Sequence, residues 1–188
     1  MIGPLIVDEG RKRGALAIAV FLAGTLISAS ATGVVIGLLG ETTLPDQGTE
    51  VSLVAVALVG IALAGADLLG RTPSNNLQTN RTWWRRGAPV ASLMWGLHLG
   101  AGFATIRVAS LYWVVCLAIF ASASPTAGLV MGAYGLGLAV NLAFGTLIAP
   151  RAAVPYPLYT RILLPPSRRV LAVLLVCWSV FVGFEAMA

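Results

Sequence analysis

Long apolar runs, separated by short loops that hold most of the charges, constrain the fold of this chain more than any other feature. The first run extends from about Gly14 to Leu39 and the second from about Val51 to Leu69. A helix of about 20 apolar residues is long enough to cross the hydrocarbon core of a bilayer. Of the 188 residues, 58% are apolar and 10% are charged, whereas soluble domains are about a quarter charged. We therefore expect an all-α, polytopic integral membrane protein, with residues 1–188 forming a single transmembrane domain.

Residues 88–123 are the most ambiguous part of this pattern. They are mostly apolar but are interrupted by GAGFATIR, and one straight helix of this length would reach about 52 Å, far beyond a core of about 30 Å. We interpret them as two short spans, roughly Ala88–Thr105 and Val108–Ala123, or as one crossing with a re-entrant piece. Runs from about Ala127 to Ala149 and from about Val170 to Phe184 complete a total of five or six transmembrane helices.

Basic residues gather in the loops between these runs, and acidic residues occupy the loop at 41–50. Cytoplasmic loops of membrane proteins carry an excess of lysine and arginine. The pattern predicts a multi-pass protein of the cell membrane, with its N-terminus and residues 71–87 in the cytoplasm. Six crossings would place the four arginines of residues 150–169 outside, whereas five would place them inside, so the charges favour five. No long basic stripe predicts a nucleic-acid partner, despite the net charge of +5.

Two segments of the chain begin alike and indicate an internal repeat. KRGALAIAVFLAGTLISASATG occupies residues 12–33, and RRGAPVASLMWGLHLGAGFAT occupies residues 85–105. Each opens with two basic residues, a glycine and an alanine, and each reaches a further glycine about ten residues later, at Gly24 and Gly96. The offset is 72–73 residues. Repeats with broken helices are common in membrane transporters, and chance similarity between apolar helices of low complexity is the alternative.

The repeated span, followed by GLVMGAYGLGLA at residues 128–139, resembles the transmembrane electron-transfer proteins of the cytochrome c biogenesis and disulfide-reductase type. It is also similar to the small exporters related to them. That family carries a Pro-Cys in each of two related spans, and the two cysteines form a redox pair. Here the matching positions hold Ser28–Ser30 and Gly100–Gly102, and neither Cys116 nor Cys177 follows a proline. The resemblance therefore implies no catalytic residue.

Polar residues inside the apolar runs are the candidates for a substrate path. Asp67 is functional, because burial of a carboxylate in a membrane is costly, or it pairs with Arg71 one helical turn later. His98 lies beside a helix break that we expect over Gly96–Thr105, and it is either functional or a core side chain bonded to backbone or water. Polar groups in membrane helices also bond to other helices or to their own carbonyls. The remaining candidates are Gly100, Ser28, Ser30, Thr32 and Asn141.

No arrangement of nucleophile, base or metal ligands is apparent, so we expect no enzymatic activity, no metal and no cofactor. The sequence favours a transporter-like or carrier protein that moves a small solute or ion across the cytoplasmic membrane. The alternative is a non-catalytic subunit or assembly partner of a larger membrane complex. Small-xxx-small spacings such as Gly96/Gly100 and Gly128/Gly132 allow close helix packing and support this alternative. The expected partners are the lipid bilayer and either identical copies or other membrane subunits.

Overall fold

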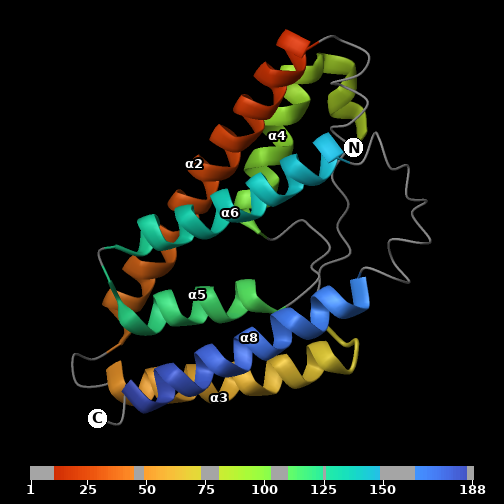
Figure 1. The fold of residues 1–188 in the computed structure, drawn as a ribbon. Coiled ribbons are helices and arrows are strands. Elements are labelled where there is room, and N and C mark those ends of the chain that lie inside the picture. Colours follow the sequence, from red (N-terminus) through yellow and green to blue (C-terminus); the bar gives the residue numbers. More distant parts are fainter. Residues whose placement is uncertain are drawn as a thin grey trace. The chain divides into compact units, whose positions relative to one another are not determined.

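The computed structural model describes residues 11–44, 49–72, 81–102, 110–124, 126–148 and 164–185. Within these ranges the chain is helical and contains no strand, so the all-α prediction is confirmed. A short 3-10 helix, η2 (Arg81–Arg86), precedes α4. The longer helices in chain order (Figure 1) are α2 (Arg11–Thr43), α3 (Thr49–Leu68), α4 (Ala88–Ala101), α5 (Leu111–Ser122), α6 (Ala127–Ile148) and α8 (Leu164–Glu185).

Two of the described helices are long and apolar enough to cross a membrane by length and composition. These are Arg13–Thr43, with 31 residues, and Val51–Leu68, with 18 residues. Shorter apolar helical stretches cover Leu111–Ser122, Ala127–Val140 and Arg169–Phe181. The larger number of five or six spans therefore stays a prediction.

The interruption within residues 88–123 begins inside the predicted range but later than its predicted start. We expected a break over Gly96–Thr105, but α4 continues through Gly96 and Gly100 to Ala101. It ends at Gly102, whose φ of 71° is left-handed and whose N–H donates to the carbonyls of His98 and Leu99. Glycine lowers helix propensity by about 1 kcal/mol relative to alanine, a cost that close packing against α2 offsets at Gly96 and Gly100. The rest of the expected break, residues 103–105, lies outside the described residues.

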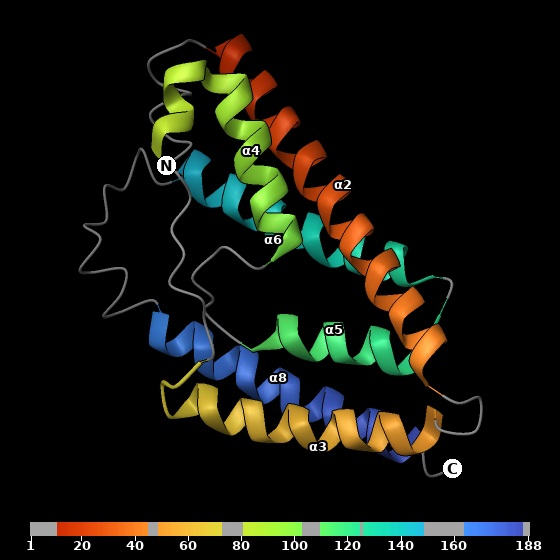
Figure 2. The same ribbon diagram turned by 180° about the vertical axis from the view of Figure 1, so that it is seen from behind.

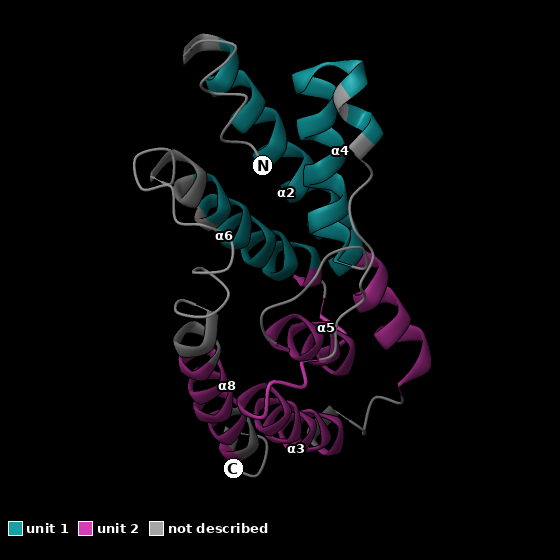
Figure 3. Ribbon diagram, turned by 90° about the vertical axis from the view of Figure 1, so that its right-hand side faces the viewer, with its two compact units in different colours: residues 1–33, 76–105, 128–154 teal, residues 34–75, 106–127, 155–188 magenta. Residues whose placement is uncertain are grey.

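The chain groups into two compact units (Figure 3), each made from three separate stretches. Unit 1 takes residues 1–33, 76–105 and 128–154, and so contains most of α2, with η2, α4 and nearly all of α6. Unit 2 takes residues 34–75, 106–127 and 155–188, and so contains the end of α2, with α3, α5 and α8. Because the stretches alternate along the chain, neither unit is a continuous domain.

In unit 1, α2 and α4 pack in parallel at a very close distance. A Cβ placed on Gly24 of α2 would lie 2.9 Å from the Leu93 carbonyl oxygen and 3.3 Å from the Leu97 nitrogen. A Cβ on Gly96 of α4 would collide with the Phe21 carbonyl oxygen. Only glycine permits such an approach of two backbones. The apolar core beside this contact comprises Phe21, Ala88, Trp95 and Ala139.

The third helix of unit 1, α6, runs antiparallel to α2. Its Gly132 faces Ser30 and Leu26, and its Gly135 faces Ala29 and Thr25, so the contacted α2 residue number falls as the α6 number rises. Figures 1 and 2 show the same opposite directions. In unit 1, α2 and α4 are therefore parallel to each other, and α6 is antiparallel to both.

In unit 2, α3 packs against both α5 and α8. Gly60 of α3 lies against both neighbours. A Cβ added to it would collide with the Ser179 hydroxyl of α8 and would contact Val114 of α5. Figures 1 and 2 show α5 and α8 running together, opposite to α3. The core of this unit consists of small and branched apolar residues, namely Val56, Ala64, Val114, Ala121, Ala172 and Leu175.

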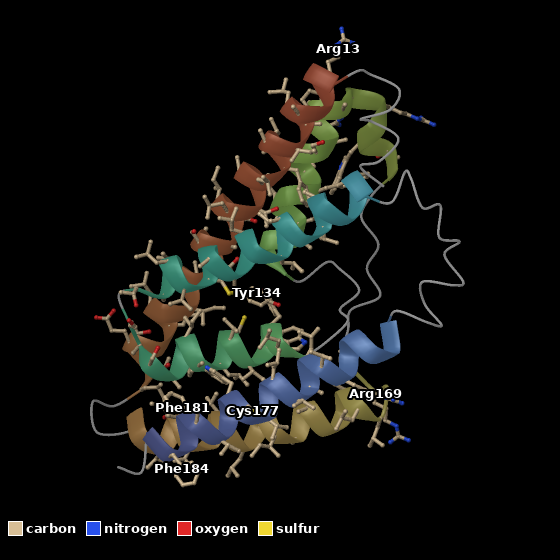
Figure 4. All side chains as sticks on the ribbon, in the orientation of Figure 1. Arg13, Tyr134, Arg169, Cys177, Phe181 and Phe184 are labelled. Atoms are coloured by element: carbon tan, nitrogen blue, oxygen red, sulfur yellow. The ribbon has the colours of Figure 1, made fainter. Side chains whose placement is uncertain are left out.

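Large apolar side chains remain exposed along most of these helices. Leu58 is 63% exposed and Leu129 is 76% exposed. On α8, Phe181 and Phe184 extend from the C-terminal half of the helix (Figure 4). Soluble monomers rarely expose apolar surface on this scale.

Candidate functional site

The carboxylate of Asp67 is the most completely buried charged group in the described residues. It lies in the last turn of α3 and has no exposed surface. Its Oδ2 accepts a hydrogen bond from the backbone N–H of Ser110 at 2.7 Å, and its Oδ1 accepts one from the Ser110 hydroxyl at 2.8 Å. Such charge-assisted hydrogen bonds are short and stronger than neutral ones.

The position of Ser110 explains this pairing. Ser110 directly precedes α5, and its side chain makes no capping bond within its own helix. The first N–H groups of a helix have no partner inside the helix, and a negative charge is favourable there. Asp67 supplies the missing acceptor from α3, 43 residues away in sequence. The end of α3 is thereby fixed to the beginning of α5 within unit 2.

Arg71 does not take part in this arrangement. It is exposed, and the described residues show no ion pair between its guanidinium and Asp67. The pairing expected four residues along a helix requires the helix to continue, but α3 ends at Leu68 and Gly70 has a φ of 74°. The partner of Asp67 is thus a serine at a helix start and not a neighbouring arginine.

Hydroxyl groups of α2, including the path candidates Ser28 and Thr32, bond to carbonyls of their own helix. Buried Thr25 donates to the Phe21 carbonyl at 2.9 Å, and Thr32 donates to the Ser28 carbonyl at 2.8 Å. The Ser28 hydroxyl lies 3.4 Å from the Thr25 carbonyl, to which it donates a long bond. Such back-bonding satisfies a hydroxyl inside a helix without any further partner.

Ser28, Ser30 and Gly100 lie at contacts between helices of unit 1. A Cβ on Gly100 would collide with the Ser28 hydroxyl and the Thr25 carbonyl, so α4 touches α2 there. Ser30 faces Gly132 of α6. The structure therefore brings these three predicted residues into helix packing.

His98 lies half-buried in α4 and contacts η2. Its ring is edge-on to the ring of Trp83, with centroids 4.9 Å apart. Its Nδ1 atom is buried and makes no hydrogen bond within the described residues. His98 and Asp67 belong to different units, and the side chain of Asn141, in α6, lies outside the described residues.

Sequence reasoning missed Ser110 and Trp83 as partners of the two titratable candidates. Ser110 had a readable signal, because serine immediately before an apolar run is a preferred residue at a helix start. Nothing in the sequence relates Trp83 to His98, fifteen positions later (98 − 83 = 15). Among the described residues, no three His, Cys, Asp or Glu side chains come close enough to hold a metal ion.

The family models, the curated proteins and the solved structures include no match to this chain. The resemblance to transmembrane electron-transfer proteins therefore stays a prediction. The positions of the cysteines do not add to it, since Cys177 is exposed on α8 (Figure 4) and Cys116 is half-buried in α5.

Proposed function

We propose that this chain is a cell-membrane protein with five crossings that carries a small solute or ion, and that Asp67 interacts with a cation or a proton during transport. The observation that carries the proposal is the fully buried Asp67 carboxylate, which accepts hydrogen bonds from Ser110 at the start of the short helix α5. Ionisable residues buried in membrane segments usually mark ion paths or proton relays. Discontinuous helices form the ion and substrate sites of many transporters.

Helix directions support five crossings. If α2 leaves the cytoplasm, α3 returns to it, and the parallel α4 leaves again while the antiparallel α6 returns. In unit 2, α5 and α8 run opposite to α3 and so also leave the cytoplasm. Two successive complete crossings must have opposite directions, whereas this assignment of α2 and α3 gives α4 and α5 the same direction relative to the membrane. They therefore form a single interrupted crossing.

The lengths of α4 and α5 agree with this interpretation. They have 14 and 12 residues, which gives about 21 Å and about 18 Å, and neither reaches the roughly 30 Å of a hydrocarbon core. With five crossings, the basic loop before α8 lies in the cytoplasm, as the positive-inside rule requires. The C-terminus then lies outside.

The chemistry of Asp67 favours a cation or a proton as the transported or coupling species. A carboxylate offers about four acceptor positions, and Ser110 uses two of them. The remaining positions are able to receive a proton or a cation. In a medium of low dielectric constant, an approaching cation is attracted much more strongly than in water.

Proteoliposomes that contain the purified chain test this proposal. Flux of protons and of alkali and divalent cations is measured with trapped indicators, with and without a membrane potential. We expect flux of at least one of these ions above that of empty liposomes. Asp67→Asn should reduce this flux at least tenfold, because it removes the negative charge while keeping the shape of the side chain. Glu41→Gln, at the exposed end of α2, is the matched control and should retain the flux.

Absence of flux for all these ions, or equal flux in Asp67→Asn and the parent protein, would reject the carrier proposal. Circular dichroism and size-exclusion profiles of each variant show whether a lost flux reflects a lost fold. If Asp67→Asn does not fold, Ser110→Ala provides a second variant. It keeps the carboxylate and removes one of its two hydrogen bonds, so it should change the ion dependence of the flux and not abolish it.

A second candidate function is that of a non-catalytic subunit of a larger membrane complex. It is favoured by the hydroxyls of Thr25, Ser28 and Thr32, which bond to carbonyls of their own helix. It is also favoured by the exposed apolar surface of the helices. Native mass measurement after mild detergent extraction distinguishes the two candidates. A stable complex with other polypeptides, without flux by the isolated chain, would support the subunit.

A further inference from the structure

Three arginines of unit 1 form an exposed basic surface, which we define as Arg13, Arg85 and Arg86. Arg13 lies in the first turn of α2, and Arg85 and Arg86 end η2, immediately before α4. All three side chains are exposed. Figure 4 shows Arg13 extending away from the N-terminal end of α2.

The parallel packing of α2 and α4 brings these residues to the same end of unit 1. At the close contact, Gly24 lies beside Leu93 and Leu97, and Gly96 lies beside Phe21 and Thr25. The first residue of α4, Ala88, precedes Gly96 by eight positions (96 − 88 = 8). Eight positions before Gly24 on the parallel helix α2 is Leu16, so Ala88 and Leu16 lie at the same level. Arg13 is three residues further, or about 4.5 Å along the helix axis. Figures 1 and 2 show the starts of α2 and α4 at the same end of unit 1.

Among the described residues, the helices that carry this basic surface bring no acidic side chain to it. The first turns of α2, η2 and α4, all among the described residues, contain no acidic residue. The described residues also show no ion pair for these three arginines. Three exposed guanidinium groups at one end of an apolar bundle produce a positive potential there.

We propose that the basic surface binds the headgroups of anionic phospholipids in the cytoplasmic leaflet. Guanidinium groups recognise phosphate oxygens through two parallel N–H···O hydrogen bonds, which ammonium groups do not offer. Basic clusters that immediately adjoin a membrane helix are attracted to anionic lipid surfaces. The inference rests on the membrane placement proposed above but not on transport, because a carrier and a complex subunit could both bind such lipids.

Native mass spectrometry of the full chain tests this inference. The detergent-purified protein is titrated separately with phosphatidylglycerol and with phosphatidylcholine of the same acyl chains. We expect the parent protein to retain phosphatidylglycerol in clear excess. The triple variant R13Q/R85Q/R86Q should lose this retention on the order of tenfold or more, because each arginine near an anionic surface contributes to binding. The control R71Q/R169Q changes two exposed arginines of unit 2 and should retain phosphatidylglycerol like the parent protein.

Equal retention of both lipids by the parent protein would overturn the proposal, as would an equal loss in the triple variant and the control. A third arm adds inorganic phosphate. Displacement of phosphatidylglycerol by millimolar phosphate would show a site for free anions and would also overturn the lipid assignment. Because the replaced side chains are exposed, the triple variant should fold, and its thermal unfolding confirms this. Ion flux is not measured here, so failure of this inference and failure of the carrier proposal remain distinguishable.

Discussion

Gly24 of α2 and Gly96 of α4 each contact the partner helix at equivalent positions. Gly24 lies against Leu93 and Leu97, and Gly96 lies against Phe21 and Thr25. Addition of 72 to the α2 numbers gives the α4 numbers in every case, since 21, 24 and 25 become 93, 96 and 97. The two helices therefore meet in a reciprocal, parallel contact at the offset that relates the two similar sequence segments.

The reciprocal contact predicts that Gly96→Ala is destabilising. The added Cβ would collide with the Phe21 carbonyl oxygen, which belongs to a helical backbone and cannot move alone. Overpacking of this kind costs about 1–3 kcal/mol. Gly137→Ala, in α6 of the same unit, is the control, because a Cβ there meets nothing within 4 Å. It should be neutral or stabilising by up to about 1 kcal/mol, since alanine favours helix. Thermal unfolding in detergent measures both, and equal midpoints would contradict the close contact.

Much of the fold could be predicted from the sequence, because apolar runs and charged loops determine where helices lie. The run at about Gly14–Leu39 becomes α2, and the ambiguous residues 88–123 contain the two short helices α4 and α5. The start of the break was predicted too early because glycine has two roles in membrane helices. It ends α4 at Gly102, where φ is positive, but inside α4 at Gly96 it allows contact with α2. Only the tertiary partner distinguishes these roles.

The candidate site was less predictable, since it depends on contacts between residues distant in sequence. Asp67 could be selected as an unusual buried carboxylate from its apolar surroundings alone. Its partner Ser110 lies 43 residues away, and no local pattern relates the two. Arg71 was the alternative because helical spacing is readable from sequence, whereas the turn at Gly70 removes that spacing.

The hydrogen bonds of Asp67 predict that substitution of Ser110 lowers stability more than substitution of Arg71. Ser110→Ala removes one hydrogen bond to a buried charged group and should lower the free energy of unfolding by about 1–3 kcal/mol. Arg71→Ala should change it by less than about 0.5 kcal/mol, because the side chain is exposed and outside the site. Equilibrium unfolding in a denaturing detergent compares the two variants. A larger effect for Arg71→Ala than for Ser110→Ala would show that an ion pair with Arg71 is the main interaction of Asp67.

The contact between Gly60 and Ser179 predicts a dependence of one substitution on the other. A Cβ on Gly60 would collide with the Ser179 hydroxyl, which is buried and makes no hydrogen bond within the described residues. Gly60→Ala should therefore be destabilising by about 1–3 kcal/mol. The same substitution should cost clearly less in a Ser179→Ala background, where the colliding oxygen is absent.

Gly65→Ala is the control for this pair. It changes a glycine of the same helix, α3, whose added Cβ meets nothing within 4 Å. It should be neutral or slightly stabilising in both backgrounds. If the cost of Gly60→Ala were the same with and without the Ser179 hydroxyl, the packing of α3 against α8 would differ from that described.

The number of membrane crossings depends on whether α4 and α5 cross separately. If α2 leaves the cytoplasm and α3 returns to it, the helix directions within each unit give α4 and α5 the same direction relative to the membrane, so the chain should cross it five times. Reporter fusions at Pro45, Asn76 and Pro155 and at the C-terminus measure this directly. A fluorescent reporter that matures only in the cytoplasm should be active at Asn76 and Pro155. A phosphatase that is active only outside should be active at Pro45 and at the C-terminus. With six complete crossings, Pro155 and the C-terminus would exchange sides while Pro45 and Asn76 would not. An external signal at Pro155 would therefore show that α4 and α5 cross separately, and Asp67 would no longer lie beside an interrupted crossing.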